Sequence, residues 1–72
     1  MNKTYDSSAF GANLTAALKK KGITQMKLAE MVDSYAGVMS DYCRGKKLPS
    51  LWMFVLICKM LDMEPGEMLE KK

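Results

Sequence analysis

Six side chains that can donate a hydrogen bond flank a short segment, residues 35–43, in the middle of the chain. They are Thr24, Gln25 and Lys27 before the segment and Arg44, Lys46 and Lys47 after it. Cations and amides bind phosphate oxygens, and the free N–H groups at a helix start add to such a site. For Gln25, an ordinary polar role in a first helical turn is an equal alternative. For the cluster after residue 43 the alternative is a solvated basic loop, and its placement favours phosphate contact.

The segment between these donors can present a polar face to a partner. Four residues recur at three- and four-residue spacing, which places them on one side of a helix: Gly37, Ser40, Asp41 and Arg44. A carboxylate on such a face can accept a hydrogen bond from the N4 amine of cytosine. For Asp41 we favour the alternative, an ion pair with Arg44 one turn away. If the partner is a nucleic acid, the candidate base-facing residues are Tyr35, Ala36, Gly37, Ser40 and Asp41.

Side chains for catalysis or metal binding are scarce. The sequence contains no histidine and no glycine-rich phosphate loop, and of its eight acidic residues only the last four, near the C-terminus, cluster. Cys43 and Cys58 lie within apolar helical stripes, where a free cysteine behaves as a small buried hydrophobe. We therefore expect no enzyme activity, no metal, no cofactor and no small-molecule substrate.

Two short predicted helices joined by a tight turn position the donors and the polar face. Thr24 suits the N-cap of the first helix, whose apolar face consists of Leu28, Ala29 and Val32. Asp33 and Ser34 follow, and both favour turns. The second helix, which Gly45 ends, has an apolar face made of Tyr35, Val38, Met39 and Tyr42. Two such helices predict a helix-turn-helix.

The motif resembles the helix-turn-helix of the phage-repressor-like family of the Cro and lambda-repressor type. The matching residues, without insertion or deletion, are Gln25, Leu28-Ala29, Arg44-Gly45-Lys46 and Pro49-Ser50. The resemblance extends over about residues 10–69. It implies a compact five-helix, lambda-repressor-like fold that binds double-stranded DNA, with the second helix of the motif in the major groove and Gln25 on the DNA backbone.

The second helix departs from the family pattern. Ala36 and Gly37 stand where family members usually carry amides or other long polar side chains, and Tyr35 replaces the usual Ser or Thr cap. The main hypothesis is a sequence-specific transcriptional regulator of prokaryotic or phage origin, acting as a repressor. The alternative is a helix-turn-helix protein-interaction module, antitoxin-like or an anti-regulator, with weak or no base readout.

Three further helices complete the predicted all-α fold. Ser7 or Ser8 caps a first helix that Gly22 ends, Ser50 caps a fourth that runs to about Leu61, and Pro65 lies in the first turn of the last. Residues 1–7 are predicted to be a loose tail and residues 8–70 a single domain.

The predicted fourth helix is apolar almost all round. Its core face is assigned to Leu51, Phe54, Val55, Cys58 and Leu61. A second apolar face consists of Trp52, Met53, Leu56 and Met60. A chain of 72 residues has too few residues to cover both faces, so we expect a homodimer built on the second one. The alternative is that Trp52 and Leu56 pack under the N-terminal tail or the last helix.

Length and charge agree with one small DNA-binding domain but do not require it. The net charge is +3, which permits a nucleic-acid partner. No apolar segment suited to a signal peptide follows the first lysine, and the longest apolar run is far short of the roughly 20 residues of a membrane span. We therefore expect a soluble, cytoplasmic protein.

Overall fold

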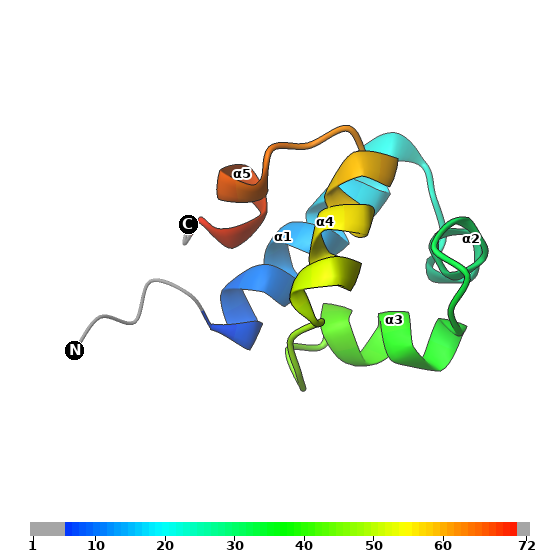
Figure 1. The fold of residues 1–72 in the computed structure, drawn as a ribbon, viewed down its shortest axis with the longest axis horizontal. Helices are drawn as coiled ribbons and strands as arrows, with labels where there is room; N and C mark the ends of the chain where they lie inside the picture. The colour runs from blue at the N-terminus through cyan, green and yellow to red at the C-terminus, as the bar shows by residue number, and fades with distance from the viewer. Residues whose placement is uncertain (1–5, 71–72) are drawn as a thin grey trace.

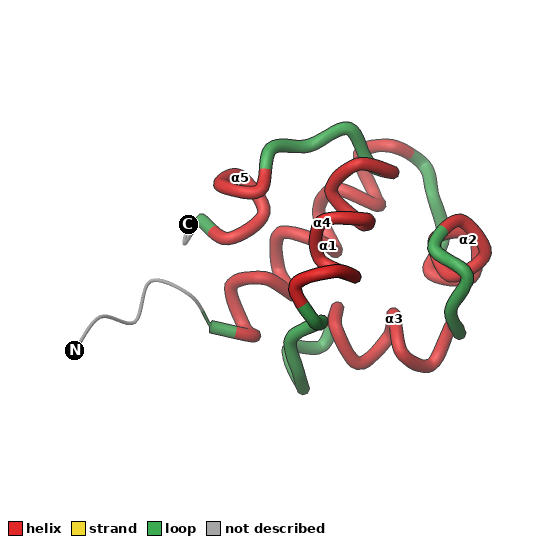
Figure 2. The backbone as a smooth tube through the Cα atoms, viewed as in Figure 1, coloured by secondary structure: helices red, strands yellow, loops and turns green. Residues whose placement is uncertain are grey.

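The computed structural model describes residues 6–70, which form five helices (Figure 1). They are α1, Ser7–Lys21; α2, Gln25–Met31; α3, Ala36–Cys43; α4, Leu51–Met60; and α5, Pro65–Leu69. Loops and turns connect them, and the described part of the chain contains no strand (Figure 2). The predicted all-α, five-helix class is confirmed. Among residues 6–70, no helix has the length and apolar content to cross a membrane.

The start of α1 differs from the predicted one. Asp6 is the N-cap, in place of Ser7 or Ser8, and its Oδ1 accepts a hydrogen bond of 2.7 Å from the backbone N–H of Ala9. A carboxylate also interacts favourably with the positive end of the helix dipole. Asp6 and Ser7 therefore belong to the N-cap and first turn of α1, and the rest of the predicted tail, residues 1–5, lies outside the described residues.

The hydrophobic core is built around α1. Phe10 and Leu14 are fully buried. The ring centroid of Phe10 lies 6.0 Å from that of Tyr42 on α3 and 5.8 Å from that of Phe54 on α4, both in edge-to-face geometry. Such aromatic pairs add to the free energy gained from apolar burial. One side chain of α1 thus contacts both the second helix of the motif and the helix that follows it.

The assignment of the α4 core face is partly wrong. Cys58 and Leu61 are buried as predicted, but Leu51 and Val55 are 78% and 41% exposed, and Ile57 is buried in their place. Every residue of α4 except Lys59 is apolar, so the sequence pattern does not indicate which side of the helix faces the core. The packing of the other helices, and not the sequence of α4 alone, selects the buried stripe.

The second apolar face of α4 is exposed only in part. Trp52 and Met60 are exposed, as the predicted interface requires. Met53 and Leu56 are only partly exposed and pack against the core. The exposed apolar surface of α4 is therefore centred on Leu51, Trp52 and Val55. We call these three residues the α4 patch.

Candidate nucleic-acid interface

Local sequence signals position α2 and the turn after it. Thr24 is the N-cap of α2, and its Oγ1 accepts a hydrogen bond of 3.0 Å from the backbone N–H of Lys27. Asp33 has a φ of 57°, in the left-handed region that Asp tolerates better than most residues. The backbone N–H of Ser34 donates to the oxygen of Ala29 at 2.8 Å, which closes the turn. The predicted cap and turn are confirmed.

The inward side of α3 holds this helix against the core. Met39 is fully buried and Tyr42 almost so, and burial raises the pKa of the Tyr42 phenol above its ordinary value. Tyr35 does not lie on the apolar face of α3 as predicted, because it is the N-cap outside the helix and is 78% exposed. The structure therefore leaves the Tyr35 ring beside the start of α3, where a partner can reach it.

The outward side of α3 carries the predicted polar face, Gly37, Ser40, Asp41 and Arg44, which we call the α3 polar face. Arg44 Nη1 donates to Ser40 Oγ at 2.8 Å, and Arg44 Nη2 lies 3.2 Å from Asp41 Oδ1. The predicted pair of Asp41 and Arg44 is confirmed. Sequence analysis missed the bond between Ser40 and Arg44, although their spacing of four residues allows it.

The basic cluster lies directly beside the α3 polar face. Lys47 Nζ lies 4.0 Å from Asp41 Oδ2, and the backbone N–H of Lys46 donates to the Asp41 carbonyl at 2.9 Å. Arg44, Lys46 and Lys47 are all exposed. Asp41 therefore contacts every member of this cluster, through its side chain or its backbone.

The donors before α3 lie at the start of α2. Gln25 is the first residue of α2 and is half-buried, whereas Thr24 and Lys27 are exposed. Lys27 Nζ lies 3.7 Å from Glu30 Oε1, an exposed pair that contributes little to stability. The candidate phosphate-binding residues thus form two groups, one at the start of α2 and one after the end of α3 (Figure 1).

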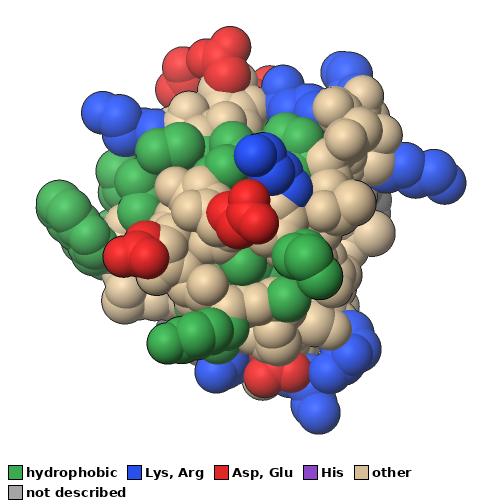
Figure 3. Space-filling model, turned by 90° about the vertical axis from the view of Figure 1, so that its right-hand side faces the viewer, with side chains coloured by type: hydrophobic (Ala, Val, Ile, Leu, Met, Phe, Trp, Pro, Cys, Tyr) green, Lys and Arg blue, Asp and Glu red, His purple; other side chains and the backbone are tan. Residues whose placement is uncertain are grey.

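Charges of both signs are interspersed on the side of the molecule that carries α2 (Figure 3). Lys and Arg side chains lie mostly towards its margins, and Asp and Glu side chains lie among them. The net charge of +3 gives only a weak overall attraction for a polyanion. Binding to DNA would therefore depend on where individual cations lie.

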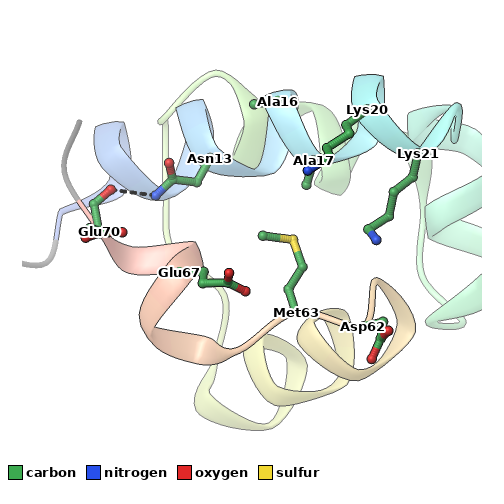
Figure 4. A pocket seen from close by; sticks show the side chains of 9 residues that line it. All are labelled: Asn13, Ala16, Ala17, Lys20, Lys21, Asp62, Met63, Glu67 and Glu70. Carbon is green, nitrogen blue, oxygen red and sulfur yellow. Dashed lines mark hydrogen bonds between the residues drawn. The ribbon is translucent and has the colours of Figure 1, made fainter.

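A polar cavity of about 340 Å³ lies between α1 and the segment from Asp62 to Glu70, which includes α5 (Figure 4). Asn13 Nδ2 donates to the carbonyl oxygens of Met68 at 2.8 Å and Glu70 at 2.7 Å. Lys20 and Lys21 of α1 and Glu67 of α5 line the same cavity. Asn13 thus anchors α5 to α1, and the cavity takes no part in the helix-turn-helix.

The sequence profile of the Cro/C1-type helix-turn-helix DNA-binding domain matches residues 13–72. The chain belongs to this family. The resemblance to phage-repressor-like proteins noted from the sequence is thereby confirmed. No protein with a curated description matches the chain by sequence.

Several solved structures share the fold. The clp gene regulator ClgR from Corynebacterium glutamicum is 30% identical with a TM-score of 0.83, over 88% of this chain and 67% of that one. The restriction-modification controller protein C.AhdI from Aeromonas hydrophila is 27% identical with a TM-score of 0.80, over 86% and 94%. The P22 c2 repressor, in complex with a synthetic operator, is 25% identical with a TM-score of 0.81, over 88% and 96%.

Proposed function

We propose that this Cro/C1-type domain is a sequence-specific transcriptional regulator that acts as a repressor, with α3 in the major groove of double-stranded DNA. The observation that carries the proposal is the α3 polar face, which is directed outward and has exposed cations next to it. The likeness to the P22 c2 repressor in its operator complex supports the same orientation. Such a protein would act in the cytoplasm of a prokaryote, on chromosomal or phage DNA.

In this arrangement the two groups of donors bind the phosphates on either side of the groove. Thr24, Gln25 and Lys27 approach one strand from the start of α2. Arg44, Lys46 and Lys47 approach the other from the end of α3. These contacts fix the register of the protein, whereas Tyr35, Ala36, Gly37, Ser40 and Asp41 face the base edges.

The proposed regulator is a homodimer that forms through the α4 patch. Leu51 and Trp52 are 78% and 79% exposed, and Leu48 in the preceding loop extends the apolar surface. Contiguous exposed apolar residues usually mark an interface, and Trp is enriched in interfaces. A two-fold dimer would present two α3 helices to DNA, about 34 Å apart.

A second candidate function is a protein-interaction module without base readout. Ala36 and Gly37 cannot hydrogen-bond a base through a side chain, and Asp41 adds a negative charge to the surface that would meet DNA. The two candidates differ in one measurable property, which is sequence-specific affinity for duplex DNA.

The experiment is a gel shift with random genomic fragments, followed by sequencing of the retained DNA. The proposed function predicts retention at low salt and enrichment of a common sequence. The interaction module predicts no retention, or retention without enrichment. A loss of affinity that follows the logarithm of the salt concentration would identify phosphate contacts.

A further inference from the structure

The unbound protein holds the α3 polar face in one connected group of side chains. Asp41 Oδ1 lies 3.2 Å from Arg44 Nη2, Asp41 Oδ2 lies 4.0 Å from Lys47 Nζ, and Ser40 Oγ accepts from Arg44 Nη1 at 2.8 Å. Two of the cations assigned to phosphates are therefore held at one carboxylate. We infer that Asp41 is a specificity-determining residue, which weakens binding to most DNA and favours sites that place the cytosine of a C·G pair opposite it.

The inference rests on the proposed function, because it requires α3 in the major groove. The contacts with Asp41 use part of the charge and of the N–H donors that Arg44 and Lys47 would otherwise offer to phosphates. When they turn to the phosphates, the carboxylate, whose side chain is 33% exposed, loses its partners and faces a polyanion. Removing one partner of an ion pair is strongly unfavourable when the remaining charge is buried. Asp41 thus lowers the affinity for every site that offers it no new partner.

The base edges differ in whether they offer such a partner. An ionised carboxylate only accepts hydrogen bonds. In the major groove, guanine and thymine present acceptors, and adenine presents a donor beside the N7 acceptor, which repels a carboxylate. Cytosine presents the N4 amine as a donor. The C·G pair is therefore the one that best replaces the cations that Asp41 gives up.

The surroundings of Asp41 leave space for a base to approach. Gly37 lies one turn before Asp41 on the same side of α3, and a Cβ atom built on Gly37 meets nothing within 4 Å. Ser40 on this face is small, and Arg44, the remaining neighbour, follows the end of α3 and turns to the phosphates in the proposed complex. No bulky side chain of α3 therefore stands between the carboxylate and the floor of a groove that this helix enters.

The test is selection from a random duplex library with the full chain, comparing wild type, Asp41→Asn and Asp41→Ala. Wild type is expected to enrich C·G at one position of its site. Asn pairs with the N6 and N7 atoms of adenine, so Asp41→Asn is expected to shift that position to A·T. Asp41→Ala is expected to lose the preference. Both variants should bind random duplexes about three- to tenfold more tightly, because a negative charge facing the phosphates is gone.

Glu30→Gln is the matched control. It removes the same charge and releases Lys27, which lies 3.7 Å from Glu30 on α2, but it leaves the α3 polar face intact. This variant is expected to keep the C·G preference, and far-UV circular dichroism checks that all variants are folded. Variants of Asp41 that keep both the wild-type base preference and the wild-type affinity for random duplexes would overturn the inference. A wild type that binds no duplex at low salt would instead contradict the proposed function.

Discussion

Gly11 on α1 lies against the carbonyl end of α3, so closely that a Cβ atom built on it would be 2.6 Å from the backbone oxygen of Tyr42. The same atom would lie 2.7 Å from the oxygen of Cys43 and 2.9 Å from the nitrogen of Gly45. All three contacts are with backbone, which cannot rotate away as a side chain can. The absence of a side chain at position 11 therefore sets how closely α1 supports the end of α3.

Replacement of this glycine should destabilise the fold. Gly11→Ala is expected to lower the free energy of unfolding by about 1–3 kcal/mol, because overpacking against backbone outweighs the gain in helix propensity. Urea denaturation followed by far-UV circular dichroism measures this change. Gly66→Ala is the control, since nothing lies within 4 Å of a Cβ atom there. Equal stability of Gly11→Ala and wild type would show that α1 and α3 can separate without cost.

Gly37 presents the opposite situation, because the fold does not require it. It is the second residue of α3 and Gly66 is the second residue of α5, and a Cβ atom at either meets nothing within 4 Å. Gly37→Ala and Gly66→Ala should each stabilise the protein by about 0.5–1 kcal/mol. Only Gly37→Ala should change DNA affinity, because it alters the α3 polar face, whereas Gly66 lies on α5. Fluorescence anisotropy with duplex DNA measures the difference, and equal affinity of the two variants would mean that α3 does not enter a groove.

The sequence predicts the helix-turn-helix because three of its four helix boundaries have a local chemical cause, the exception being the start of α3, where Tyr35 makes no side-chain cap bond. Thr24 caps α2 through its own hydroxyl, Asp33 adopts the left-handed turn, and Gly45, with a φ of 76°, follows α3. These signals act over three or four residues, so no tertiary information is needed to interpret them. The pairing of Asp41 with Arg44 is predictable for the same reason.

The remaining features depend on contacts between elements far apart in the sequence. The close approach at Gly11 and the bonds from Asn13 to α5 arise from tertiary packing. The buried stripe of α4 cannot be predicted where nearly every residue is apolar. The sequence does not single out Asp6 as the N-cap of α1, because Ser7 and Ser8 beside it are equally acceptable cap residues.

The basic cluster should determine how DNA affinity depends on salt. Lys46→Ala and Lys47→Ala should each weaken binding to all duplexes and make the slope of log affinity against log salt shallower by about one unit. Lys20→Ala is the control, because it removes the same charge from α1, outside the helix-turn-helix. Anisotropy titrations at several salt concentrations give the slopes. A slope that falls equally for all three variants would show that only the net charge matters.

The α4 patch should hold two copies of the chain together. Leu51 and Trp52 are the most exposed large apolar residues of α4, and exposure on this scale is unfavourable unless a partner covers it. We expect analytical ultracentrifugation to show a dimer at high micromolar concentration, and a double variant, Leu51→Glu/Trp52→Glu, to be monomeric and still helical. Charge at these positions opposes association without touching the core, whereas Leu56→Glu would also disturb packing.

Met26→Glu separates this interface from a general effect of surface hydrophobicity. Met26 is 65% exposed, but it lies on α2, outside the α4 patch. This variant should remain a dimer, because it adds the same type of charge to a surface that the second copy does not cover. A wild type that stays monomeric at high micromolar concentration would exclude the dimer. A dimer that survives Leu51→Glu/Trp52→Glu would instead place the interface on another surface, and the spacing of the two α3 helices would no longer follow from α4.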